Sequence, residues 1–170
     1  CHDAFDLCPA LDIIVIPNII TKISSRAFSS CSSLKIIVVA EGNPVYDSRN
    51  NCNAIVDTET NELIVGCATT IIPHGVTKIG DWAFSGCASL TSIIIPESVT
   101  AIGRCAFEFC SSLANINIPN GVTVINHGAF EHCTALESIN IPKSTTWISQ
   151  LFMGCDSLSS IVIEKGNPKY

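Results

Sequence analysis

The chain has 170 residues, of which 47% are hydrophobic and 14% charged, and its formal net charge is −6. This composition is too apolar for a disordered chain and is sufficient for one buried core, so we expect a single domain over residues 1–170. The basic residues never cluster, which argues against nucleic acid as a partner, and every apolar stretch is interrupted too early to predict membrane insertion.

The segment Ala-Phe-x-x-Cys dominates the sequence and recurs with a Leu three residues after each Cys. It begins at Ala4, Ala27, Ala83, Ala106 and Ala129. The surrounding unit returns every 23 residues, at Pro73, Pro96, Pro119 and Pro142. A fixed period of this size predicts a solenoid, here of about seven coils. Cys1 and Tyr170 both lie inside a unit, so we expect both ends to be cut within repeats of a longer array.

The first stiff segment of each unit is Leu-x-x-Ile-x-Ile, as in Leu90–Ile95 and Leu136–Ile141. Alternation and β-branching predict a strand whose final isoleucines point inward. Stacked units then make a parallel sheet, which we expect to form one continuous face. A proline follows these strands directly and should end each of them.

The second segment, Val-Thr-x-Ile, is too short for a helix and predicts a short strand or extended turn on the opposite side. Its threonines should stack in a column made of Thr21, Thr77, Thr100, Thr123 and Thr146. The Ala-Phe-x-x-Cys stretch is expected to form a short helical or 3₁₀ turn. Its rings should form an interior spine of Phe5, Phe28, Phe84, Phe107, Phe130 and Phe152.

Residues 41–71 break the period and are called the island below. The island contains Ala54–Asp57 and Glu62–Val65 around a polar four-residue turn, a pattern typical of a β-hairpin. We expect the hairpin to replace one regular crossover and to bulge from the solenoid.

The units at Ile72–Leu90 and Ile95–Leu113 closely resemble the BspA-like subclass of leucine-rich repeats, and the island resembles the spacer of such arrays. The resemblance implies a right-handed leucine-rich repeat solenoid, mostly β with a parallel sheet on one face. It also implies a bacterial surface or secreted protein, Bacteroides-like, with a role in cell adhesion. Family members described as adhesins bind extracellular-matrix proteins such as fibronectin and fibrinogen, which makes a host matrix protein the implied partner.

Six cysteines occupy one position of the repeat and are called the thiol column: Cys8, Cys31, Cys87, Cys110, Cys133 and Cys155. Stacked neighbours have parallel Cβ vectors, so buried thiols acting as small apolar fillers are favoured over disulfides. Cys52 and Cys67 in the island either pair or stay free, and the sequence leaves this open.

Catalysis is not expected, because no nucleophile motif or phosphate-binding glycine loop is present. No cofactor and no metal site are predicted. A zinc site at His127, His132 and Cys133 is an alternative, but solvated histidines on a turn are favoured because the spacing is poor. A calcium site at Asp47, Asp57, Glu59 and Glu62 is disfavoured, because the island lacks the alternating oxygen ligands of a Ca²⁺ loop.

The outward positions of the Leu-x-x-Ile-x-Ile strands form the candidate protein-binding face, which we call the front face. Its first half carries an apolar column and its second half Asn and Ser. Trp82 and Trp147 lie elsewhere, either as alternative exposed anchors or packed against neighbouring units. A protein-binding module is the leading hypothesis, and a carbohydrate-binding or purely structural spacer array is the alternative; the oligomeric state is not encoded. The front face consists of Asp12, Ile13, Val15, Lys35, Ile36, Val38, Thr91, Ser92, Ile94, Ala114, Asn115, Asn117, Glu137, Ser138, Asn140, Ser159, Ser160 and Val162.

Overall fold

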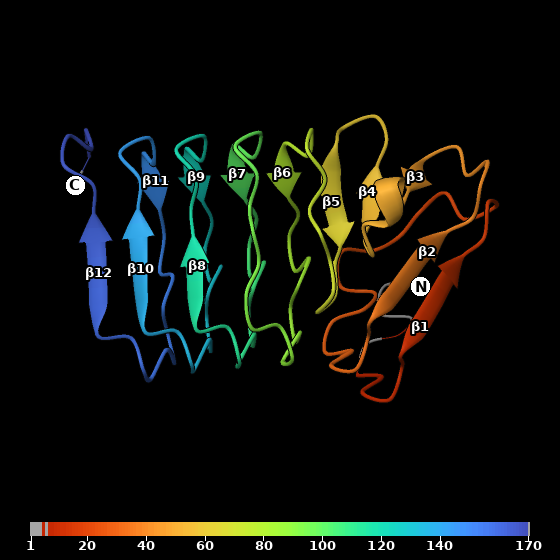
Figure 1. Ribbon diagram of the computed structural model, residues 1–170, viewed down its shortest axis with the longest axis horizontal. Coiled ribbons are helices and arrows are strands. Elements are labelled where there is room, and N and C mark those ends of the chain that lie inside the picture. The colour runs from red at the N-terminus through yellow and green to blue at the C-terminus, as the bar shows by residue number, and fades with distance from the viewer. Residues whose placement is uncertain (1–4, 6, 170) are drawn as a thin grey trace.

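The computed structural model describes residues 5 and 7–169, which form a β-solenoid of about seven turns with almost no helix (Figure 1). The predicted solenoid is therefore confirmed. The strands are β1 (Ile13–Ile16), β2 (Ile36–Val39), β3 (Tyr46–Asp47), β4 (Ile55–Asp57), β5 (Glu62–Val65), β6 (Lys78–Ile79), β7 (Ala101–Ile102), β8 (Asn115–Asn117), β9 (Val124–Ile125), β10 (Ser138–Ile141), β11 (Trp147–Ile148) and β12 (Ser160–Ile163). Within the described residues, the 3₁₀ turn η1 (Arg49–Asn51) is the one helical element.

Two of the front strands, β2 and β10, alternate between the core and solvent as expected, whereas all four residues of the last strand, β12, are exposed. In β2, Ile37 and Val39 are buried while Ile36 and Val38 are exposed, and Ile139 and Ile141 of β10 are buried in the same way. The prediction of one continuous front face is wrong. Among the described strands, β1 pairs only with β2, whereas β8, β10 and β12 form a separate three-stranded parallel sheet.

The opposite side carries a longer sheet, which we call the back sheet. Seven strands form it in the order β11-β9-β7-β6-β5-β4-β3. The Val-Thr-x-Ile segments supply its parallel two-residue strands, as predicted. In Figure 1 these strands lie behind the front strands and run the other way, so the two sheets enclose the core.

The threonine column tightens the back sheet. The hydroxyl of Thr100 donates to the carbonyl oxygen of Thr77 at 3.1 Å, and that of Thr123 donates to Thr100 at 3.2 Å. The column starts in the island, because the Thr77 hydroxyl donates to the carbonyl of Thr60 at 3.2 Å. The described bonds therefore join Thr60, not the predicted Thr21, to the column.

The Ala-Phe-x-x-Cys segments form turns and not helices. The four segments that begin at Ala27, Ala83, Ala106 and Ala129 each contain a bond from the Cys N–H to the carbonyl three residues earlier, such as Cys87 N–H to Phe84 at 3.0 Å. A helix cannot continue, because residues directly before the Ala and before the Cys adopt left-handed conformations, with φ of 51° at Cys105 and 57° at Phe109. The freed amide groups bond to the next coil instead, as in Phe84 N–H to the carbonyl of Ala106 at 2.8 Å.

The phenylalanine spine exists in two pieces. Phe107 stacks on Phe84 at a centroid distance of 5.0 Å and on Phe130 at 5.5 Å, with near-parallel rings. Phe5 and Phe28 form a separate stacked pair at 5.2 Å, and Phe5 is exposed instead of interior. Gly66 of the island interrupts the spine, since a Cβ there would lie 2.1 Å from the ring of Phe84. The predicted interior position is thus confirmed for Phe28, Phe84, Phe107 and Phe130 and is wrong for Phe5, and the uninterrupted spine is not found.

The hairpin in the island is confirmed, because β4 and β5 pair antiparallel. It does not bulge from the solenoid. The side chains of Ile55, Val56 and Leu63 are fully buried, and β5 pairs parallel with β6 of the next regular coil. Each strand of a hairpin has one edge that its partner strand leaves unpaired. The free edge of β5 pairs with β6, so the back sheet continues through the island.

Candidate binding surface

Most of the predicted front-face side chains point to solvent. Ala114 and Asn140 are half-buried, and the other sixteen of the eighteen residues are exposed. Their outward direction follows from the alternation of side chains in the Leu-x-x-Ile-x-Ile segments, in which the leucine and the isoleucines point into the core. The described structure therefore presents these residues as a surface, but divides them between two sheets.

The N-terminal part of the front face is apolar. Ile13 lies beside Ile36 and Val15 beside Val38 in the parallel register of β1 and β2. These four side chains are between 40% and 57% exposed. Exposed aliphatic area of this kind is a feature of contact surfaces, because it gains free energy when a partner covers it.

A salt bridge flanks these aliphatic residues. Lys35 Nζ and Asp12 Oδ1 lie 3.2 Å apart, and both side chains are more than half exposed. An exposed pair of this kind contributes little stability, so its charges are available to a partner.

The C-terminal part of the front face is polar. Asn115, Ser138 and Ser160 lie side by side across β8, β10 and β12, and Asn117 and Asn140 form the next row. The Asn140 amide donates to Glu164 Oε1 at 3.2 Å, which holds that side chain against the surface. This half therefore presents mainly hydrogen-bonding groups, and Val162 beside Asn140 is its exposed aliphatic side chain.

The two halves are separated by residues 67–72, a stretch that contains no strand. Cys67 and Pro73 are six positions apart, whereas Cys87 and Pro96 are nine apart, so this coil lacks the length for a front strand. Side chains hold the stretch in place instead. The Thr70 hydroxyl donates to the carbonyl of Asn53 at 2.6 Å, and the Thr69 hydroxyl donates to the carbonyl of Lys35.

A groove of about 410 Å³ lies at this break, between residues 70–74 and residues 92–96. Ile71 and Ile94 project beside it with exposures of 75% and 87%. Ile94 belongs to the predicted front face, but Ile71 and His74 were missed. The shortened Cys67-to-Pro73 spacing is the signal in the sequence that could have placed them here.

The two tryptophans behave differently from one another. Trp82 is half-buried between two guanidinium groups, with the Cζ atoms of Arg26 and Arg104 at 5.4 and 5.5 Å from its ring centre. Such contacts stabilise the stacking of coils. Trp147 is 58% exposed on the back sheet, so of the two it is the one that reaches solvent.

The alternative zinc ligands are not brought together. The His132 ring stacks on Phe109 at 4.6 Å, and the Cys133 sulfur donates to the carbonyl of Phe107 at 3.1 Å. His127 instead faces Glu131, with Nε2 at 3.9 Å from Oε1. Each of the three residues thus has a different neighbour.

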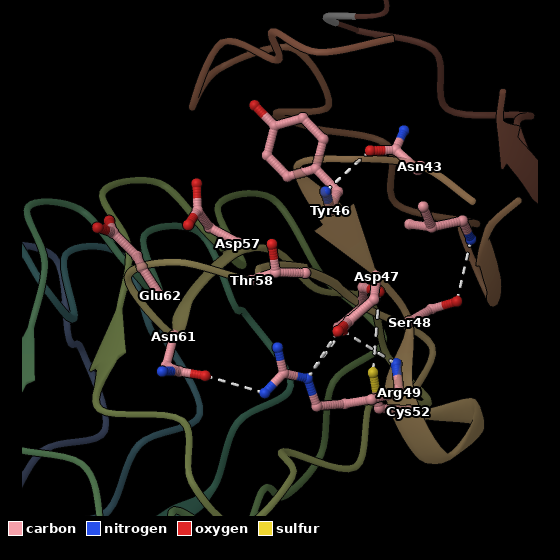
Figure 2. Close-up of polar contacts among 12 residues, drawn as sticks. Asn43, Tyr46, Asp47, Ser48, Arg49, Cys52, Asp57, Thr58, Asn61 and Glu62 are labelled. Atoms are coloured by element: carbon pink, nitrogen blue, oxygen red, sulfur yellow. Dashed lines mark hydrogen bonds and ion pairs between the residues drawn. The ribbon is translucent and has the colours of Figure 1, made fainter. Parts of the chain in front are cut away.

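Figure 2 shows Asp47 of the island bonded to the side chain of Arg49. The Arg49 guanidinium bonds both Asp47 carboxylate oxygens, at 2.8 and 3.0 Å, and reaches Asn61 Oδ1 at 2.9 Å. This bond to Asp47 raises the pKa of Arg49. These contacts tie the start of the island to its hairpin.

Two further island carboxylates have structural contacts. Asp57 accepts the backbone N–H groups of Thr60 and Glu59, and the bond from Thr60 is the main cause that lowers the pKa of the Asp57 carboxyl. Glu62 Oε1 lies 2.9 Å from Lys78 Nζ. The carboxylates of Asp47, Asp57 and Glu62 therefore stabilise turns and ion pairs and do not converge on one point.

The thiol column has a specific bonding pattern. The sulfurs of Cys110, Cys133 and Cys155 donate to the carbonyl oxygens of Phe84, Phe107 and Phe130 at 3.0 to 3.2 Å. Each thiol therefore satisfies the carbonyl of the Phe in the preceding coil. Burial raises the pKa of Cys87 and of Cys133 to about 12, and raises that of Cys110 well above its ordinary value, so these thiols stay protonated.

The island cysteines are separate from this column. Cys52 and Cys67 are both buried free thiols. The Cys67 sulfur donates to the carbonyl of Asn53 at 3.4 Å, and burial raises the pKa of Cys52. The sequence left open whether Cys52 and Cys67 form a disulfide, and in this structure they do not.

The fold and repeat pattern together define a leucine-rich repeat solenoid. The family model for the BspA type leucine rich repeat region matches six copies over residues 1–54 and 65–169. The chain belongs to this family. No curated protein matches the chain.

Similar solved structures come from bacteria. A leucine rich cell surface protein from Faecalibacterium prausnitzii is 33% identical, with a TM-score of 0.64 over 91% of this chain and 48% of its own. A leucine-rich repeat protein from Bacteroides ovatus is 32% identical, with a TM-score of 0.58 over 95% of this chain and 33% of its own. The pneumococcal vaccine antigen PcpA shares the fold at 22% identity, with a TM-score of 0.77 over 92% of this chain and 40% of its own.

The chain thus spans between a third and a half of these proteins. Within the described residues, no helix is long and apolar enough to cross a membrane.

Proposed function

We propose that residues 1–170 act as one non-catalytic protein-binding module of a surface or secreted bacterial protein, with adhesion to a host extracellular-matrix protein as its role. The observation that carries this proposal is the exposed apolar surface on the front face. It runs from Ile13, Val15, Ile36 and Val38 to the groove flanked by Ile71 and Ile94. Description of the Faecalibacterium relative as a cell surface protein supports the surface location.

The proposed occupant is an extended segment of the partner protein. The groove lies where a regular coil would have a front strand, and the bridge between Ile94 and Asn117 is the isolated end of the C-terminal front sheet. A segment laid there would add a strand at this sheet end and cover the exposed isoleucines. In strand addition, hydrogen bonds between backbone groups provide affinity, and pockets for alternate side chains of the added strand provide specificity.

The affinity of one such site is expected to be modest. Trp, Tyr and Arg carry most of the free energy in tight interfaces, and the front positions hold none of them. Repeated weak sites gain strength when several engage one partner, because the later contacts form within the same complex. A long array of coils suits this mode of binding.

The test is capture of the folded chain on immobilised fibronectin and fibrinogen. A variant with Val15→Glu, Val38→Glu and Ile94→Glu should lose at least about tenfold in apparent affinity, which corresponds to about 1.4 kcal/mol. The matched control carries Ser112→Glu, Asn120→Glu and Ser157→Glu, at exposed positions outside the front face, and should bind as the unmodified chain does.

Equal loss in both variants, equal binding by both, or no capture of the unmodified chain would overturn the proposal. In the last case, binding to a panel of glycans would indicate the carbohydrate-binding alternative. If the chain binds neither the matrix proteins nor the glycans, a structural spacer is indicated.

A further inference from the structure

A second cluster of chemically capable side chains lies on the turn side of two adjacent coils, away from the front face. Cys105 Sγ and carboxylate oxygens of Glu108 and Glu131 lie within 4.8 Å of one another. Cys105 and Glu131 are buried, and Glu108 is half-buried. We call these three residues the Cys105 cluster.

The register of the coils creates this cluster. Glu108 and Glu131 occupy the same position of successive units, directly after Phe107 and Phe130. The bond from Phe109 N–H to the carbonyl of Glu131, at 2.9 Å, holds the two turns side by side. Stacked coils therefore place two carboxylates next to each other, an arrangement that costs free energy when both are charged.

Gly128 makes room for the three side chains to meet. It stands where Cys105 stands in the preceding unit, and its φ is +69°. A Cβ at this position would lie 2.9 Å from Cys105 Sγ and 3.3 Å from Glu131 Oε2. Any other residue would push the thiol and the carboxylate apart.

The cluster holds more negative than positive charge. The Glu131 side chain is only 9% exposed, and its carboxylate faces His127. Glu108 Oε2 accepts a bond from the Ser85 hydroxyl at 3.3 Å. The cationic groups beside the cluster are His127, with Nε2 at 3.9 Å from Glu131 Oε1, and Arg104, which directly precedes Cys105 in the chain.

Two carboxylates and a thiol held within 4.8 Å of one another repel when they are charged, and a bound cation removes that repulsion. One sulfur, two carboxylates and one imidazole together match the ligands and the coordination number that zinc prefers in proteins. Calcium and magnesium prefer oxygen alone, so the sulfur argues against them.

We propose that Cys105, Glu108 and Glu131 bind one zinc-class divalent transition-metal ion, with His127 as the fourth ligand. On binding, the thiol proton passes to solvent and a metal–sulfur bond forms, while the carboxylates coordinate without further proton loss. The ion would join two neighbouring coils and stabilise their stacking. The role of the ion would be structural, because its ligands come from two neighbouring coils that already pack against each other.

The test is a zinc titration of the metal-free chain against a chromophoric chelator, followed by thermal unfolding with and without zinc. One ion per chain and a higher unfolding temperature are expected. Cys105→Ser and Glu131→Gln should each weaken zinc binding at least tenfold and abolish most of the temperature shift. Cobalt in place of zinc should give a thiolate-to-metal absorption band that Cys105→Ser removes.

Cys155→Ser and His132→Gln are the matched controls, because they change a thiol and an imidazole in the same region outside the cluster. They should bind zinc as the unmodified chain does. Circular dichroism of Glu131→Gln checks the fold, and this variant removes a buried charge without changing the shape of the side chain. The proposal is overturned if no saturable site exists, or if Cys105→Ser and Glu131→Gln bind as tightly as the controls.

Discussion

In the regular coils from Pro96 onward, each unit forms one front strand, one strand of the back sheet and a turn, so both sheets gain hydrogen bonds from every unit. In the island and directly after it, the chain instead forms a hairpin and the stretch of residues 67–72, which is held in place by side chains. The hairpin continues the back sheet, but the stretch leaves the front sheet divided. The comparison shows that the two sheets of a solenoid can be uncoupled, and that a groove appears where only one of them continues.

The core of the regular coils depends on rings that are packed on both sides. Phe107→Ala should reduce the free energy of unfolding by about 3–5 kcal/mol, because it leaves a cavity between Phe84 and Phe130. Phe109→Ala, in the same coil, removes a ring that is 47% exposed and should cost less than about 1 kcal/mol. Urea unfolding of both variants measures the difference, and similar losses would contradict the proposed spine.

The side-chain amide of Asn43 attaches the start of the island to the first coil. Asn43 Nδ2 donates to the carbonyls of Pro17 and Ile20 at 3.0 and 2.9 Å, and Oδ1 accepts the N–H groups of Val45 and Tyr46. Asn43→Ala leaves these groups without partners and should cost about 2 kcal/mol.

Asn18→Ala is the control for this change, since Asn18 is exposed and the substitution should stay within about 0.5 kcal/mol. Thermal unfolding of both variants decides whether the side chain of Asn43 fastens the island. Equal stability of the two would show that it does not.

The buried thiols make the free energy of unfolding depend on pH in the alkaline range. A pKa of about 12 for folded Cys133, against 9.0 when unperturbed, means that the unfolded chain loses its proton first. The stabilising effect is complete below pH 9 and is lost as the pH rises toward 12. Each such thiol steepens the fall by up to about 1.4 kcal/mol per pH unit.

Cys133→Ala should therefore flatten the plot of unfolding free energy against pH above pH 9, while Thr134→Ala should leave its slope unchanged. Urea unfolding at a series of pH values measures both. Parallel curves for Cys133→Ala and the unmodified chain would contradict the raised pKa of the Cys133 thiol.

Much of the fold could be predicted because it follows from the period. Phe84, Phe107 and Phe130 recur at one spacing, so a stack of rings required no knowledge beyond the register of the coils. The hairpin could be predicted from its two apolar runs. Its union with β6 could not, because pairing between an island and a regular coil depends on which edge is free after folding.

The surface was harder to predict than the core. The front positions were found from alternation, but Ile71 was not, because a coil without a front strand has no alternation to follow. Cys105, Glu108 and Glu131 were missed for another reason. Their meeting depends on left-handed turn residues such as Cys105 and Gly128, and the sequence pattern does not fix how side chains of such residues point.

Amide hydrogen exchange tests most directly whether the back sheet runs through the island while the front sheet stops there. The Thr77 and Gly80 amides bond to the carbonyls of Asn61 and Leu63 at 3.0 and 2.8 Å, and should be protected as strongly as Thr100 and Gly103. Ala68, Thr69 and Ser92, at the break, should exchange at least about 100-fold faster. Equal protection on the two sides of the solenoid, or fast exchange at Thr77 and Gly80, would contradict this architecture.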